Sequence, residues 1–503
     1  MRFRVLSSLC FCVMCALAAT GARADDLPNG LALKAQIAAA QCTPASNFQE
    51  TIVSHNAGGD GGALTYHFDG SSRTLYGTGP IHRESGSYKG EAWVRDENGV
   101  TIADDDPPGP PRTVSVAHGD TPETLVLSDL TKSGDGTRTT VDAKTLQVRR
   151  IETIDPIHTE TTTYTSYATF SGCSMPATWT VTSDLLPTPS TTTFAREHVV
   201  LGGVTADLVA EPPTPDIVTF PSGAARVDIP ATFQADGHVI VRANIAGLDA
   251  DFVLDTGSSD IIIPQVLARR LGLTLQNPGT TTAARSIATS QAVVPVMRIG
   301  RLEMHDVVVT VADTFRTGTQ GPELGLLGFD FFATLEISID YLHRHVSAAS
   351  GWDFHEPADA DATPIDIRLG NRVPMITATI NGTAHADRVI VDTGGAGDLL
   401  LFDYFNRRHP EVFGTPEFAQ LMFTGVGGAF ETKAFRFQSI KLGRLTLLNF
   451  DAYRTTGKQS YPYAADGLFG PEFLRHFTVD FDYVHAQMVL RENHDGGLLP
   501  AAH

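Results

Sequence analysis

Two copies of the triplet Asp-Thr-Gly place carboxyl groups at matched positions of the chain. Asp255 begins the first copy and Asp392 the second, and an apolar run precedes each of them directly. Such a run predicts a β-strand that delivers the aspartate to a tight turn. Gly257 and Gly394 would let that turn bend and present its amide N–H groups. The sequence therefore predicts two carboxylates on two equivalent turns.

Two such carboxylates form an acid–base pair when they meet. Carboxyl groups ~3 Å apart cannot both ionise, so they share one proton. The ionised member can activate a water molecule for attack on a carbonyl carbon, while the protonated member donates to the carbonyl oxygen. This chemistry needs no metal ion and no cofactor, and none is expected. Because the two motifs are alike, the sequence does not tell which aspartate holds the proton.

The region around the triplets repeats itself along the chain. Gly325-Leu326-Leu327-Gly328 is matched by Gly467-Leu468-Phe469-Gly470, 142 positions later, and Asp340-Tyr341 is matched by Asp482-Tyr483 at the same offset. Ordered landmarks at nearly constant offsets indicate a duplicated unit of roughly 130–140 residues, about the size of a compact half-domain. We expect two similar lobes that face each other across a cleft.

The paired triplets, each followed by two apolar residues and a glycine, resemble the active-site motifs of the pepsin-like and retropepsin-like aspartic peptidases. The resemblance covers about residues 222 to 492. It implies an all-β, bilobal fold in which Asp255 and Asp392 are catalytic, and a polypeptide substrate cleaved by water that the pair activates. The framework that would pack beneath the catalytic turns consists of Leu326, Leu327, Gly328, Leu468, Phe469 and Gly470.

By the same resemblance, Thr256 and Thr393 would exchange hydrogen bonds with backbone across the lobe interface. The remaining residues that would support the pair are Gly257, Ser258 and Gly394. An extended peptide in the cleft would pair with one β-hairpin flap from each lobe. The flap residues implied are Ser286 and Ile287 in the first lobe, and Gly425, Val426 and Gly427 in the second.

The chain departs from the usual pattern of that family in several places. Gly395 follows the second triplet where the family usually carries a serine, alanine or threonine, whereas Ser258 follows the first. The first flap region, residues 280 to 300, contains no tyrosine, and the lobes contain no cysteine. The missing tyrosine, the short lobes and the absence of cysteine favour the retropepsin-like branch. The glycine also leaves open an alternative function, that of a catalytically silent peptide-binding protein with the same cleft.

The first 24 residues are typical of a cleaved secretory signal peptide. Arg2 and Arg4 give a positive end, an apolar stretch follows, and Ala22-Arg23-Ala24 is a small-x-small cleavage site. The alternative, a membrane anchor, would need about 20 apolar residues, and this stretch is shorter. We expect a periplasmic or secreted protein without stable membrane insertion.

Cysteine usage fits that compartment. Once the signal is removed, Cys42 and Cys173 remain, and a pair in an oxidising compartment most simply forms one disulfide. The alternative is two unrelated buried thiols, because pairing geometry cannot be read from sequence.

Proline-rich residues 212–221 predict a linker between domains. Before it, residues 25–211 begin with a short helix over 31–40 and continue as alternating, threonine-rich segments typical of antiparallel sheet. This N-terminal domain is faintly similar to the half-open β-barrels of periplasmic lipoprotein carriers. An inhibitory pro-segment, a substrate- or ligand-binding module and a structural appendage are its alternative roles. After the linker, we predict lobe 1 over residues 222–355 and lobe 2 over residues 356–503.

Charge and the remaining motifs exclude several functions. The chain has 57 acidic and 37 basic side chains, a formal charge of −20, and such a surface repels nucleic acid. His343 and His345 alternate along a predicted strand, a spacing that can serve a metal, but no third ligand is evident nearby and we interpret them as structural. Asn381-Gly382 between apolar runs predicts a hairpin turn. Duplication within one chain makes a monomer sufficient for the site, although the oligomeric state is not determined by the sequence.

Overall fold

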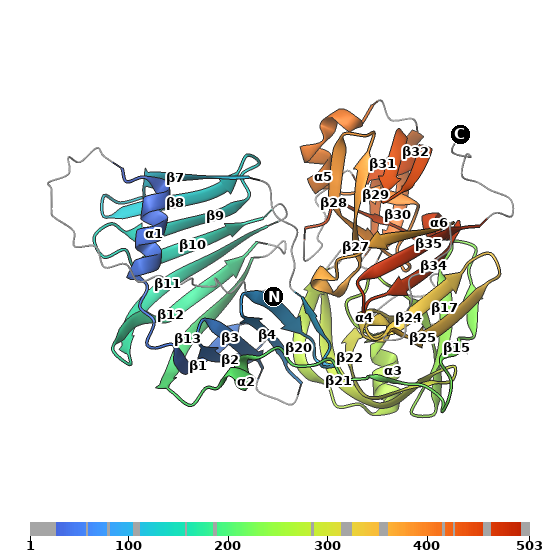
Figure 1. Ribbon diagram of the computed structural model, residues 1–503, viewed down its shortest axis with the longest axis horizontal. Helices are drawn as coiled ribbons and strands as arrows, with labels where there is room; N and C mark the ends of the chain where they lie inside the picture. The colour runs from blue at the N-terminus through green and yellow to red at the C-terminus, as the bar shows by residue number, and fades with distance from the viewer. Residues whose placement is uncertain are drawn as a thin grey trace. The chain divides into compact units, whose positions relative to one another are not determined.

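The computed structural model describes residues 27–56, 59–77, 81–103, 111–155, 158–184, 189–282, 286–312, 324–351, 361–414, 418–425, 428–455 and 464–493. Contacts divide the chain into two compact units (Figure 1). Unit 1 comprises Met1–Glu97 and Thr101–Pro213, and unit 2 comprises Asn98–Val100 and Thr214–His503. The predicted signal peptide lies outside the described residues. In the part of the chain that is described, no helix is both long and apolar enough to cross a membrane.

The described part of unit 1 is a 13-stranded antiparallel sheet with a helix on one face (Figure 1). The strand order is β6-β5-β4-β3-β2-β1-β13-β12-β11-β10-β9-β8-β7, so nearly every strand pairs with its neighbour in sequence. The elements are α1 (Gly30–Ala40), β1 (Asn47–Asn56), β2 (Gly59–Phe68), β3 (Ser71–Tyr76), β4 (Arg83–Tyr88), β5 (Glu91–Arg95), β6 (Thr101–Ala103), β7 (Arg112–His118), β8 (Thr124–Thr131), β9 (Gly136–Asp142), β10 (Val148–Ile154), β11 (Thr159–Phe170), β12 (Cys173–Ser183), β13 (Ser190–Leu201) and α2 (Ala206–Val209).

Helix α1 confirms the helix predicted over residues 31–40. It begins after Asn29, whose side chain accepts hydrogen bonds from the first backbone N–H groups of the helix and so caps it. Leu33 and Ile37 are one turn apart and therefore share a face, and they pack in a buried cluster with Leu127 and Val141 of the sheet. This cluster gives unit 1 its own apolar core.

Cys42 and Cys173 form a disulfide in unit 1, with an S–S distance of 2.08 Å and a Cα–Cα distance of 5.4 Å. The bond joins the segment after α1 to the first residue of β12, across a sequence separation of 131 residues. It therefore closes most of unit 1 into one covalent loop.

The first repeat of unit 2, lobe 1, has a nine-stranded sheet among the described residues. Its elements are β14 (Val218–Thr219), β16 (Ala231–Phe233), β17 (Val239–Ile245), β18 (Leu248–Leu254), β19 (Ile262–Ile263), α3 (Gln265–Leu271), β20 (Gln276–Thr282), β21 (Ser286–Ile299), β22 (Leu302–Ala312), β23 (Gly325–Leu327) and α4 (Phe329–Phe332).

The second repeat, lobe 2, has a seven-stranded sheet within the described ranges. Its elements are the 3-10 helix η2 (Gly370–Arg372), β27 (Met375–Ile380), β28 (Ala384–Val391), β29 (Leu399–Leu401), α5 (Asp403–Arg408), the 3-10 helix η3 (Pro410–Val412), β30 (Phe418–Gly425), β31 (Gly428–Leu442), β32 (Leu445–Thr455), β33 (Gly467–Phe469) and α6 (Pro471–Leu474). The predicted turn at Asn381-Gly382 joins β27 to β28, and both residues have positive φ angles, as a hairpin turn requires.

A six-stranded sheet joins the two repeats, in the order β15-β25-β24-β34-β35-β26. At its centre β24 and β34 pair antiparallel, and Ser338 faces Asp480, the position 142 residues later in the repeat. Equivalent positions that face each other indicate a local twofold axis between the lobes. The strands are β15 (Arg226–Asp228), β24 (Leu335–Asp340), β25 (His345–Ser350), β26 (Ala362–Asp366), β34 (Phe477–Asp482) and β35 (Gln487–Glu492).

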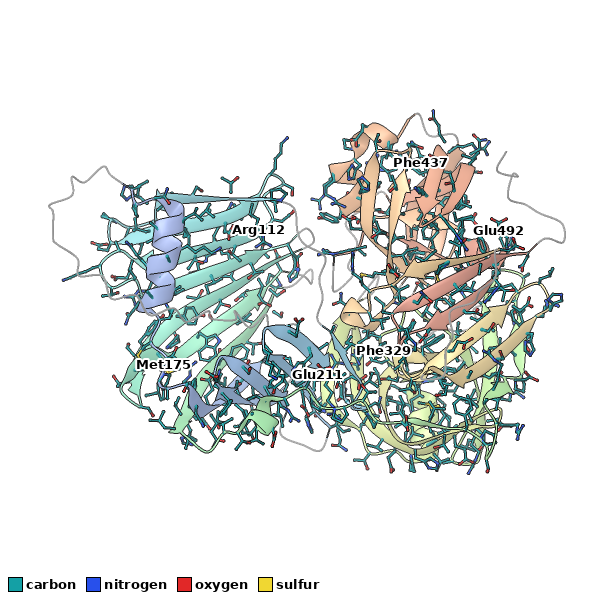
Figure 2. The ribbon with its side chains drawn as sticks, viewed as in Figure 1. Arg112, Met175, Glu211, Phe329, Phe437 and Glu492 are labelled. Carbon is teal, nitrogen blue, oxygen red and sulfur yellow. A yellow bond between two sulfur atoms is a disulfide. The ribbon has the colours of Figure 1, made fainter. Side chains whose placement is uncertain are left out.

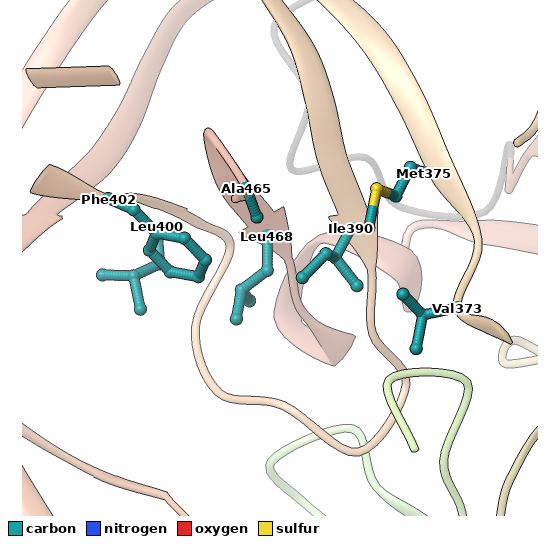
Figure 3. Close-up of a cluster of buried hydrophobic side chains, with 7 residues drawn as sticks. All are labelled: Val373, Met375, Ile390, Leu400, Phe402, Ala465 and Leu468. Carbon is teal, nitrogen blue, oxygen red and sulfur yellow. The ribbon is translucent and has the colours of Figure 1, made fainter. Parts of the chain in front are cut away.

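The strands that lead to the two triplets are anchored by apolar clusters that contain equivalent residues of the repeat. In lobe 1, Val253 of β18 packs with Leu326 of β23. In lobe 2, Ile390 of β28 packs with Leu468 of β33, inside the cluster drawn in Figure 3. The paired strands are parallel in both lobes, and each of these four side chains is at most 5% exposed. The core therefore fixes the ends of β18 and β28, where the aspartates follow.

Candidate functional site

Each aspartate leaves its strand at the same point of the same local structure. The backbone N–H of Asp255 donates to the carbonyl oxygen of Leu327 at 3.0 Å, and that of Asp392 donates to the carbonyl oxygen of Phe469 at 2.9 Å. These bonds extend the parallel pairing of β18 with β23 and of β28 with β33 by one residue. The repeat detected in the sequence thus continues to the atoms that position the two carboxylates.

The threonines of the triplets bind across the lobe interface. Thr256 Oγ1 donates to the carbonyl oxygen of Val391 at 2.6 Å and accepts from the backbone N–H of Thr393 at 3.0 Å. Thr393 Oγ1 donates to the carbonyl oxygen of Leu254 at 2.7 Å and accepts from the backbone N–H of Thr256 at 3.0 Å. Both side chains are fully buried. This reciprocal cross-brace, defined by Thr256 and Thr393, holds the two turns at one depth.

The two carboxyl groups meet at the interface, where each acts on the pKa of the other. Each lies against the glycine of the opposite triplet. A Cβ atom added at Gly257 would come within 3.0 Å of the Asp392 carboxyl group, and one added at Gly394 would come equally close to that of Asp255. Both glycines are thus required by the close approach of the opposite carboxylate.

Burial raises the pKa of both carboxyl groups, so the pair retains a proton. The pKa of Asp255 lies well above its ordinary value because of burial, with the charge of Asp392 and their mutual hydrogen bond adding to the shift. Burial also raises the pKa of Asp392, against the effects of the Asp255 hydrogen bond and of backbone N–H donors. Because the two carboxyl groups are close together, repulsion between two negative charges disfavours the state in which both are ionised. The arrangement provides one acid and one base.

The residues that follow the triplets differ between the lobes. Ser258 Oγ donates to the carbonyl oxygen of Asp260 at 2.8 Å, so its proton is not directed at Asp255. At Gly395, a Cβ atom would lie 2.8 Å from Asp392 Oδ2. The departure at position 395 therefore has a steric reason, since the second turn leaves no room for a side chain in this conformation.

The framework residues named from the sequence lie beneath the turns. Leu326 and Leu468 are each 3% exposed, and Leu327 and Phe469 are fully buried. The glycines that follow pack tightly, because a Cβ atom at Gly328 or Gly470 would meet backbone carbonyl oxygens of the Asp-Thr-Gly turn regions.

The predicted flap residues lie in or beside two β-hairpins. In lobe 1, β20 pairs with β21, where Ser286 is the first residue and Ile287 is 9% exposed. In lobe 2, β30 pairs with β31 and Gly425 faces Gly428. Val426 and Gly427 lie outside the described residues. Both hairpins belong to the sheets that carry the aspartates.

One residue of the site was not found from the sequence. His238 lies between β16 and β17 of lobe 1, and its Nε2 atom is 3.2 Å from the carbonyl oxygen of Gly394 in lobe 2. The available signal was a histidine directly after Asp236-Gly237, a typical turn pair. The internal repeat does not identify His238, because the equivalent position in the second repeat, 137 residues later, is Met375.

Tyr483, identified only as a landmark of the repeat, is a second such residue. It is 4% exposed, stacks on Phe332 and on Phe329, which is labelled in Figure 2, and its hydroxyl has no hydrogen-bond partner among the described residues. Burial raises its pKa well above the ordinary value, and the charges of Asp255 and Asp392 raise it further. It contributes an aromatic support close to the pair.

The histidines considered for a metal bind carboxylates instead. His343 Nδ1 donates to Asp340 Oδ2 at 2.7 Å, and His345 Nε2 donates to Asp228 Oδ1 at 3.0 Å. Within the described ranges, no group of three or more histidine, cysteine or acidic side chains is arranged to hold a metal ion.

Comparison with known proteins gives a match for part of unit 2. Residues 241–331, which include the first triplet and Leu326-Leu327-Gly328, match the family model described as aspartyl protease. No curated protein matches the chain. A crystal structure of a DUF1329 family protein from Desulfovibrio piger ATCC 29098 is similar with 12% sequence identity and a TM-score of 0.28, over 36% of this chain and 95% of that chain. Residues 241–331 thus form an aspartyl protease-like region.

Proposed function

We propose that the protein is an exported aspartic endopeptidase whose catalytic pair is Asp255 and Asp392, with a bilobal fold of the retropepsin-like type. The observation that carries the proposal is the contact between the two carboxyl groups, fixed by the reciprocal bonds of Thr256 and Thr393. The match of residues 241–331 to the aspartyl protease model supports it independently.

The chemistry follows from the shared proton. The ionised carboxylate removes a proton from a water molecule as its oxygen attacks the scissile carbonyl carbon, and the protonated carboxyl group donates to the carbonyl oxygen. A proton then passes to the leaving nitrogen as the C–N bond breaks. The cross-brace keeps both carboxyl groups in place through these steps, so little reorganisation accompanies the reaction.

A polypeptide in extended conformation is the substrate that fits this architecture. Hairpins β20–β21 and β30–β31 offer backbone donors and acceptors that can pair with a peptide chain, while neighbouring side chains select its sequence. Under this proposal both hairpins act as flaps, and the whole site lies within one chain.

Replacement of either aspartate by asparagine tests the proposal. We expect Asp255→Asn and Asp392→Asn each to lower kcat for cleavage of an unfolded polypeptide by at least about a thousandfold, because one member of the acid–base pair is lost. Cleavage is measured between pH 3 and 8 by mass spectrometry, with and without a statine-type inhibitor.

Asp251→Asn is the matched control for these variants. It makes the same substitution on β18, the strand that leads to Asp255, at a partly exposed acid that pairs with Arg242 on the surface. Its cleavage rate should equal that of the wild type. An Asp255 or Asp392 variant that still cleaves at the wild-type rate would remove the proposal.

A second candidate function is peptide binding without turnover. The absence of a side chain at Gly395 and the direction of the Ser258 hydroxyl favour it, since neither residue supplies a hydroxyl to the carboxylates. Binding of an unfolded polypeptide with no products at any pH between 3 and 8 would select this candidate.

The proposal includes export by the signal peptide at residues 1–24. The Cys42–Cys173 disulfide supports an oxidising compartment. N-terminal sequencing of the protein recovered from periplasmic and extracellular fractions tests this part, with Asp25 expected as the first residue.

A further inference from the structure

His238 connects lobe 1 to the second Asp-Thr-Gly turn. Its Nε2 atom contacts the Gly394 carbonyl, and the turn that carries His238 packs against α6 of lobe 2. A Cβ atom at Gly237 would come within 3.0 Å of Pro471, and Arg475 Nη1 donates to the carbonyl oxygen of Ala235 at 3.3 Å. The histidine is therefore held by both lobes, with a side chain that is 25% exposed.

Both ring nitrogens of His238 face hydrogen-bond acceptors. Nδ1 is 3.0 Å from Asp236 Oδ1, and Nε2 is 3.2 Å from the carbonyl oxygen of Gly394. A neutral imidazole has one N–H group, so only the imidazolium form donates to both acceptors. Against the effect of burial, the charge of His238 and its hydrogen bonds hold the pKa of Asp236 below its ordinary value.

The contact joins His238 to the residue that binds the carboxylate of Asp392. The carbonyl oxygen of Gly394 faces His238 Nε2, and the backbone N–H of the same residue donates to Asp392 Oδ1 at 3.0 Å. The backbone N–H of Gly395 donates to the backbone carbonyl oxygen of Asp392 at 3.3 Å. A hydrogen bond from His238 to the Gly394 carbonyl therefore holds in place the residue whose N–H binds the Asp392 carboxylate. The charge of His238 also acts on Asp392 directly and favours its ionised form.

Asp255 has a different environment. The groups that act on its carboxyl are Asp392 itself and the backbone N–H groups of Gly257 and Ser258. Its side chain is also the more deeply buried of the two, with the residue 6% exposed. The local twofold symmetry is thus broken at the pair, with the imidazole of His238 on the Asp392 side.

We propose that His238 is a positioning residue that keeps Asp392 ionised and leaves the shared proton on Asp255. The inference rests on the proposed peptidase function and assigns its roles. Asp392 takes the proton of the attacking water as the new C–O bond forms, and Asp255 gives its proton to the carbonyl oxygen.

Other charged groups near His238 also contribute to any pH dependence of the site. Asp236 belongs to the same turn as His238. From lobe 2, Arg475 contacts the turn. The positive charge of Arg475 lowers the pKa of Asp398, and the negative charge of Glu472 in α6 raises it. A test must therefore change the charge of His238 while leaving these four residues in place.

The His238→Gln variant meets that condition. Glutamine keeps an N–H donor for the Gly394 carbonyl but carries no charge. In an Asp255→Asn background, Asp392 titrates without its partner, and ¹³C NMR of aspartate-labelled protein follows its carboxyl carbon. The signal is assigned by its loss in Asp255→Asn/Asp392→Asn. Adding His238→Gln should move the titration midpoint of Asp392 to higher pH.

His343→Gln is the matched control, because His343 also donates to an aspartate but its side chain is 72% exposed in a pair with Asp340. It should leave the Asp392 midpoint unchanged. An Asp392 midpoint that does not move in the His238 variant, or that moves equally in the His343 variant, overturns the proposal. This measurement needs no catalysis, so it decides the role of His238 even if the protein proves not to be a peptidase.

Activity gives the second readout. With a substrate that the wild type cleaves, His238→Gln should shift both limbs of the pH profile of kcat/KM to higher pH, with a roughly three- to tenfold loss on the acidic limb. A merely structural role would instead lower the rate at every pH and leave both limbs in place. Absence of cleavage by the wild type would count against the peptidase function alone.

Discussion

At the scale of single residues, Asp398 shows how the loop after the second triplet responds to pH. Burial, together with the negative charges of Glu472 and Asp451, raises the pKa of Asp398 to about 6, against the attraction of Arg475. The folded protein therefore binds this proton more tightly than the unfolded chain does. The stability of wild type should fall as the pH rises from about 4 to about 6, where the buried carboxyl group ionises.

The Asp398→Asn variant should remove this loss. We expect it to exceed the wild type in free energy of unfolding by about 1–2 kcal/mol at pH 7, after allowance for the partial exposure of the group, with no such difference at pH 4. Urea unfolding at both pH values measures it, and Asp251→Asn serves as the surface control. A pH-independent difference between Asp398→Asn and the wild type would contradict the assignment.

At the scale of elements, the cross-brace makes the two β-strand ends interdependent. The Thr256→Val variant keeps the shape of the side chain but leaves the Val391 carbonyl and the Thr393 N–H buried without their partner. We expect a loss of about 2–4 kcal/mol in the free energy of unfolding of unit 2, from ~1–3 kcal/mol for each orphaned group. Cleavage should fall as well, because Asp255 is the adjacent residue.

The control is Thr256→Ser, which retains the hydroxyl and should recover most of the stability. Because Thr393 belongs to the same network, the double variant Thr256→Val/Thr393→Val should lose less than the sum of the two single losses. Equal losses for the serine and valine variants of Thr256 would show that the hydroxyl does not hold the turns together. Chemical denaturation measures the free energy of unfolding of each variant, and the substrate cleavage assay measures its activity. Together they distinguish these outcomes.

The elements of the structure differ in how well the sequence predicts them. The strands before Asp255 and Asp392, the turn at Asn381-Gly382 and the helix at residues 31–40 are local structures, so their own residues predict them. The turn that carries His238 is also local, but its contact with Gly394 is made between lobes. A residue whose partner is 156 positions away in the chain leaves no periodic signal.

At the scale of the whole molecule, the division into two units predicts separable stability. The Cys42–Cys173 disulfide spans 131 residues within unit 1, whereas the cross-brace and the pair Asp255 and Asp392 lie in unit 2. We expect Cys42→Ser/Cys173→Ser to lower the free energy of unfolding of unit 1 by about 2–5 kcal/mol, mainly because the unfolded chain gains conformational entropy without the cross-link. Peptide cleavage should stay unchanged.

Calorimetry of the full chain checks this prediction, because each unit has its own core and should give its own transition. Only the transition of unit 1 should move in the double serine variant, and reduction of the wild type should reproduce the shift. A simultaneous shift of the unit 2 transition, or loss of cleavage, would show that the units do not behave independently.

The sequence by itself determined the mostly β composition, the duplicated unit, and the two Asp-Thr-Gly turns, because each depends on residues close together in the chain or on an internal repeat. Only the tertiary structure decided the environment of each carboxyl group. Burial and the approach of His238 come from segments distant in sequence, whereas the hydroxyl direction of Ser258 and the lack of room at Gly395 come from the folded conformation of each turn. Acidity depends on every charge and dipole within a few ångströms, and two similar motifs therefore acquire different properties once the chain has folded around them.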